Sequence, residues 1–257
     1  MTMKLSNGHS ARQLTTQLQH DSEQKVAERK AALRRDVYLP AAEAIVKLSG
    51  RMGALPQLDL ANIDAQLEFA NFGAAIAKVQ LVGEPETAAL AGEVLSEYGS
   101  AFMRCVSKAG TIQLERAYAA IQDNLYNDAQ LQVKRLLAEM TALNESGAPD
   151  PAKFQRLNDS FQFFSKQAED RAGARAGHQE TAGALQMQYL QDTVAKMKSL
   201  NVKYLPLVVA IRHELGFEGD LMHFQRMLER QTAEIEEAVD GIIRDMKARP
   251  SAGSRTG

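Results

Sequence analysis

The longest uninterrupted feature of the sequence is a run of about 60 residues, 85–144, in which apolar side chains recur every three or four positions and no proline follows Pro85. This spacing places the apolar side chains on one face of an α-helix. At about 1.5 Å of rise per residue, such a helix would be about 90 Å long. Because most of the stability of a helix comes from packing, the run predicts other long helices beside it.

A turn signal follows this run at residues 146–151, which read Ser-Gly-Ala-Pro-Asp-Pro. Gly147 can end one helix, Asp150 can cap the next, and Pro151 suits a first helical turn. A helical pattern then continues over residues 151–200. The sequence therefore predicts an all-α fold, an elongated bundle whose two longest helices form an antiparallel, coiled-coil-like hairpin joined near residue 147.

The rest of the chain also favours helices, since it is rich in alanine and leucine and contains no tryptophan. We expect helices over residues 10–54, 60–82, 206–215 and 220–248, with a kink or a restart at Pro40. Residues 1–10 and 249–257 are predicted to be disordered. Residues 11–248 are predicted to form a single domain, with a body of 11–84 and 202–248 and a long arm of 85–201.

The middle of the second long helix, residues 165–183, lacks regularly spaced apolar side chains for about five turns. A stretch of this kind is solvated, or it packs through something other than an apolar stripe. We therefore expect a solvated face and keep a binding face and a flexible bend as alternatives.

One short pattern occurs twice. Tyr38-Leu39-Pro40 is followed by Ala44, Ile45 and Gly50, and Tyr204-Leu205-Pro206 is followed by matching residues at the same offsets. The repeat is explained either by chance or by two equivalent helix starts that pack side by side.

Few residues suggest catalysis or metal binding. The single cysteine, Cys105, lies in an apolar run and is predicted to be a buried small hydrophobe. Glycine loops for phosphate and the usual hydrolase motifs are missing from the sequence. The weak metal candidates are His213, Glu214 and His223, which cluster around a predicted helix break, and no cofactor is predicted.

The main electrostatic feature is a segment with basic side chains among acidic ones. Its basic residues are Lys25, Arg29, Lys30, Arg34 and Arg35. This segment is either a solvated helix laced with ion pairs or a surface that contacts an anionic membrane. The net charge of -2 gives no general attraction to nucleic acid, which is therefore not an expected partner.

These features predict a non-enzymatic structural or adaptor protein that acts through helix–helix interactions. A homodimer and an unidentified protein partner are expected. The alternatives are a peripheral membrane-binding dimer, by analogy with the architecture of BAR-like proteins, and a helical metal-binding protein or enzyme. Because the chain has no apolar run of about 20 residues, we expect a cytoplasmic protein whose membrane contact would be peripheral.

Overall fold

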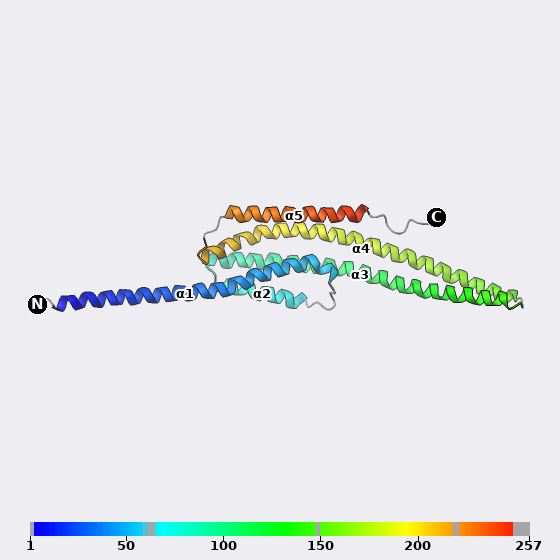
Figure 1. Cartoon of the computed structure of the whole chain (residues 1–257), viewed down its shortest axis with the longest axis horizontal. Helices are drawn as coiled ribbons and strands as arrows, with labels where there is room; N and C mark the ends of the chain where they lie inside the picture. Colours follow the sequence, from blue (N-terminus) through cyan, green and yellow to red (C-terminus); the bar gives the residue numbers. More distant parts are fainter. Residues whose placement is uncertain (1–2, 59, 61–64, 148–149, 218–220, 249–257) are drawn as a thin grey trace. The chain divides into compact units, whose positions relative to one another are not determined.

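The computed structural model describes residues 3–58, 60, 65–147, 150–217 and 221–248 (Figure 1). Over these residues the chain is helical and contains no strand, which confirms the predicted all-α class. The elements are α1 (Met3–Ala54), the short 3-10 helix η1 (Leu55–Gln57), α2 (Ala65–Val82), α3 (Pro85–Glu145), α4 (Pro151–Glu214) and α5 (Leu221–Ala248). No described helix has an apolar stretch long enough to cross a bilayer.

The chain forms two compact units, and α3, α4 and α5 contribute residues to both. Unit 1 consists of Met1–Ala54, Asp59–Arg104 and Val194–Glu236. Unit 2 consists of Leu55–Leu58, Cys105–Thr193 and Glu237–Gly257. The change from one unit to the other along α3 thus follows Arg104, whereas we expected the body to give way to the arm at residue 85.

The core of unit 1 is built from large apolar side chains on four helices. On α1 the buried positions recur every three or four residues, and α2 packs along this part of α1. Tyr98 of α3 lies against Phe72 of α2, with ring centroids 6.0 Å apart. Further buried residues of this core are Tyr38, Ala41, Ile45, Leu48, Met52, Ile76, Val79, Val94, Phe102, Leu200 and Leu207.

Unit 2 contains the predicted hairpin, made by the second part of α3 and the first part of α4. Gly147 follows the end of α3 with a φ of 67°, a left-handed conformation that glycine adopts without steric cost. Asp150 caps α4, since its Oδ1 accepts a hydrogen bond from the Lys153 backbone N–H at 2.9 Å. Cys105 is buried in this unit, as predicted.

The helix boundaries differ from the predicted ones at one of the two internal prolines, Pro206, since the helical segment predicted over 10–54 already contained Pro40. Pro40 lies inside α1 and Pro206 lies inside α4, so the helix expected over 206–215 is the last part of α4. Leu200 and Leu207 are both fully buried on either side of the α4 position where a break was expected. Because one continuous helix buries both side chains, packing outweighs the hydrogen bond that a proline removes.

The true end of α4 lies at a glycine. Gly216 has a φ of 78°, and its backbone N–H donates to the His213 carbonyl at 3.0 Å. The Phe217 N–H donates to the Arg212 carbonyl at 2.9 Å. This pair of bonds is the Schellman arrangement, which satisfies carbonyls at the end of a helix.

Two expectations at the termini have different outcomes. We expected residues 1–10 to be disordered, whereas α1 begins at Met3. The tail at 249–257, which was also predicted to be disordered, lies outside the described residues.

Candidate functional site

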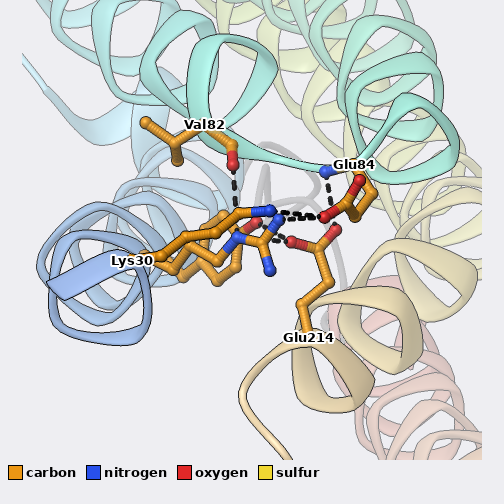
Figure 2. A network of polar contacts seen from close by, with 6 residues as sticks. Lys30, Val82, Glu84 and Glu214 are labelled. Carbon is orange, nitrogen blue, oxygen red and sulfur yellow. Dashed lines mark hydrogen bonds and ion pairs between the residues drawn. The ribbon is translucent and has the colours of Figure 1, made fainter. Parts of the chain in front are cut away.

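Unit 1 contains a network of charged side chains that joins α1, α4 and the start of α3 (Figure 2). The Arg34 guanidinium lies at its centre, with its Nε 3.0 Å from Oε2 of Glu214 and its Nη2 2.5 Å from Oε1 of Glu84. Lys30 reaches the same Glu84 oxygen at 2.9 Å. The side chains of Arg34 and Glu214 are only 10% and 6% exposed, so their ion pair is buried.

Glu214 also holds the start of α3. Its Oε1 accepts a hydrogen bond from the Glu84 backbone N–H at 2.9 Å, and its Oε2 accepts one from the Tyr38 hydroxyl at 2.5 Å. The first N–H groups of a helix have no partner within the helix and carry a partial positive charge. A carboxylate from α4 therefore caps α3 across 130 residues of sequence.

The electrostatics of the network follow from these contacts. Hydrogen bonds from Lys30 and Arg34 lower the pKa of Glu84 to about 2. Burial raises the pKa of Glu214, but hydrogen bonds from Thr87, Tyr38 and the Glu84 backbone outweigh it and leave that pKa below its usual value. Burial, with the hydrogen bond to Glu214, raises the pKa of Tyr38. Both carboxylates are therefore ionised at neutral pH and are held by donors from α1 and from the start of α3.

The network changes the interpretation of the basic segment. Lys25, Arg29 and Arg35 are exposed, but Lys30 and Arg34 bind carboxylates of their own unit. Their charges are neutralised there, which leaves a smaller positive charge for an anionic surface than the sequence suggested. No local pattern predicts this pairing, because Glu84 and Glu214 lie 50 and 180 positions from Arg34.

The three weak metal candidates are placed as follows. Glu214 uses its oxygens in the network, while His213 and His223 are exposed, on α4 and α5 respectively. Among the described residues, no group of three or more His, Cys, Asp or Glu side chains is arranged to hold a metal ion.

Residues of both copies of the Tyr-Leu-Pro pattern line one cavity in unit 1. The cavity has a volume of about 220 Å³ and lies between α1 and the end of α4. Matching residues of the two copies face it: Tyr38 and Tyr204, Ala41 and Leu207, Ala42 and Val208, Ile45 and Ile211. The two segments thus pack side by side, as one interpretation of the repeat predicted, although both lie within helices rather than at their starts.

The polar stretch 165–183 packs against α3 in unit 2. Arg175 forms an ion pair with Asp123, and its guanidinium lies over the Tyr126 ring at 5.1 Å. His178 Nδ1 lies 2.7 Å from Oε2 of Glu115. Ala168 and Ala182 are buried at the two ends of the stretch. One side of the stretch is therefore a polar seam of the hairpin, while most of its residues are exposed, in line with the expected solvated face.

A second apolar face of α3 escaped the sequence interpretation, which had placed the apolar residues of this helix in one series. Ala109, Ile112, Ala119 and Leu136 are buried, but another set lies on a different face and is 38% to 51% exposed. This set, which we call the α3 stripe, consists of Leu114, Tyr118, Ile121 and Leu125. Its spacing of 4, 3 and 4 is visible in the sequence and could have identified it.

Comparisons with protein-family models, with curated proteins and with solved structures find no match for this chain. The candidate sites are therefore interpreted from geometry alone. The charged network joins helices, and two further features, the α3 stripe and residues 17–33 of α1, present helical surfaces to solvent.

Proposed function

We propose that this protein is a structural or adaptor protein that binds other helices, and that residues 17–33 of α1 form a binding surface. One observation supports this proposal. Every side chain over residues 17–33 of α1 is exposed, whereas Arg34 and Tyr38, immediately after it, are buried. In Figure 1 this blue part of α1 extends beyond α2 and beyond the start of α3.

A helix without a packing partner is marginal in water, because propensity alone contributes little to its stability. Polar side chains support this segment only locally, for example through the hydrogen bond from Gln24 to Glu28 at 3.2 Å. Leu18, Val26 and Leu33 share one face and are 53% to 62% exposed. A partner helix that covers this face would supply the missing apolar packing.

The proposal is tested by placing a photo-crosslinking amino acid at Val26 in the full chain and irradiating its native cells. Gln24 is the matched control, because two positions along a helix turn the side chain by about 200°. We expect a discrete protein adduct from Val26 and none from Gln24.

The captured protein is then purified and its binding to the full chain is measured. Val26→Glu should weaken binding at least about tenfold, because it buries a charge against an apolar partner, and Gln24→Glu should not. Equal adducts from both faces, or binding that Val26→Glu leaves unchanged, would contradict the proposal.

A further inference from the structure

The α3 stripe is an apolar surface on a helix that already has a packed face. Leu114, Tyr118, Ile121 and Leu125 are 51%, 42%, 51% and 38% exposed. Their spacing is that of the core positions of a coiled coil, where each residue inserts between four residues of a facing helix. Exposed apolar surface arranged in this way is typical of an interaction site.

The order of residues in the stripe indicates which helix fits it. Read in either direction, the stripe begins and ends with leucine and has the same spacing of 4, 3 and 4. Two copies that run antiparallel therefore place Leu114 of one against Leu125 of the other, and Tyr118 against Ile121. A two-fold symmetric contact requires such a self-complementary surface.

The residues that flank the stripe are compatible with this pairing. Glu115 and Gln122 lie along one side, and Ala117 and Asn124 along the other. An antiparallel pair places Glu115 opposite Gln122 and Ala117 opposite Asn124, so that no like charges face each other. A parallel pair would instead place Glu115 of each copy beside Gly110 of the other, which offers no polar partner, whereas the antiparallel pair places it opposite Gln122.

From these observations we propose that two copies of this chain associate through antiparallel α3 stripes. The contact is small: four partly exposed side chains per copy bury on the order of 700 Å² in total, below the roughly 1,200 Å² typical of stable specific complexes. The dimer is therefore weak and forms at micromolar or higher protein concentrations. The inference shares helix–helix recognition with the proposed function but uses a different helix, so the two can fail separately.

The test is sedimentation velocity of the full chain from about 1 µM to about 500 µM, the range in which a weak dimer dissociates. We expect a shift from monomer to dimer. Tyr118→Lys and Ile121→Glu should each weaken self-association at least tenfold. Leu137→Lys is the control, since Leu137 is also exposed on α3 but lies outside the stripe, and Val26→Glu should leave the dimer intact.

Mixing the two variants distinguishes the antiparallel pairing from other contacts. In an antiparallel heterodimer, the new lysine at 118 faces the new glutamate at 121, and the other copy's Tyr118 faces an unchanged Ile121. Equimolar Tyr118→Lys and Ile121→Glu chains should therefore associate more strongly than either alone. A monomer at all concentrations, a dimer that neither variant weakens, or a mixture that fails to recover would each overturn the proposal.

Discussion

Glu214 shows how one side chain can hold three helices. Its carboxylate accepts hydrogen bonds from the Tyr38 hydroxyl on α1 and from the Glu84 backbone at the start of α3, and it pairs with Arg34. A buried ion pair adds little net stability compared with apolar side chains of the same shape. Removing one partner is different, because it leaves the other charge buried without compensation.

We therefore predict that Glu214→Ala lowers the free energy of unfolding by about 3 kcal/mol, since the Tyr38 hydroxyl and the Glu84 backbone lose their acceptor and the buried Arg34 keeps only Glu84 as a carboxylate partner. Glu93→Ala is the matched control, because Glu93 pairs with Lys203 at 3.1 Å but both side chains are about half exposed. The Glu93→Ala substitution should change the free energy of unfolding by no more than about 1 kcal/mol. Urea denaturation followed by circular dichroism measures both, and equal losses in the two variants would contradict this role for Glu214.

At the scale of single elements, a glycine inside a helix and a glycine between two helices illustrate different constraints. Gly177 lies inside α4, and a Cβ atom there would have no neighbour within 4 Å. Gly83 lies between α2 and α3, and a Cβ atom there would come 2.9 Å from the Val79 carbonyl oxygen and 3.2 Å from Thr87. Gly83 does not have a positive φ, so close packing rather than a left-handed turn requires glycine at this position.

Gly177→Ala should raise the stability by about 0.5 to 1 kcal/mol, because alanine is the better helix former and the space is open. Gly83→Ala should lower the stability, because a backbone oxygen must move to make room. Thermal unfolding of the two variants beside the wild type tests the pair. A lower melting temperature for Gly177→Ala would indicate that the chain needs flexibility in the polar seam.

The elements differ in how far the sequence predicts them. Local signals were sufficient for α3, which begins at Pro85 as expected and ends at Glu145, one residue beyond the predicted end. They were also sufficient for the turn at Gly147. They failed at Pro206, because the proline signal is local, whereas the burial of Leu200 and Leu207 that keeps α4 continuous depends on tertiary packing.

The side-chain contacts of the candidate sites were less predictable than the helices. The ion pair between Arg175 and Asp123 joins residues 52 positions apart, and that between Arg34 and Glu214 joins residues 180 positions apart. Polar side chains carry no periodic signal that identifies such partners. The residues 165–183 therefore looked solvated, although their alanines are small enough for two helices to approach and their charged groups find partners on α3.

At the scale of the whole molecule, the two units differ in the size of their buried side chains. Unit 1 buries tyrosine, phenylalanine and methionine, including Tyr98, Phe102 and Met52. In unit 2 the hairpin buries mainly alanine over residues 119–182, where Ala119, Ala129, Ala168 and Ala182 lie in its seam. Because hydrophobic stabilisation scales with buried apolar area, the hairpin should be the less stable part.

Hydrogen exchange of the full chain measures this difference directly. Amides of the unit 1 core, such as residues 91–102, should exchange only through global unfolding. Amides of residues 120–180 should exchange at least about tenfold faster through local opening of the hairpin, and those of residues 17–33 faster still. Equal protection of the hairpin and the unit 1 core would contradict this gradient.

The carboxylate that caps α3 also affects how the chain folds during its synthesis. During synthesis the start of α3 leaves the ribosome before residue 214 is translated, so its first turn waits for its cap until 130 further residues have been made. Domains usually fold in the order in which they emerge. Here Arg34, Tyr38 and the Glu84 backbone cannot bind Glu214 until the end of α4 has been made. Their polar groups remain hydrated until then.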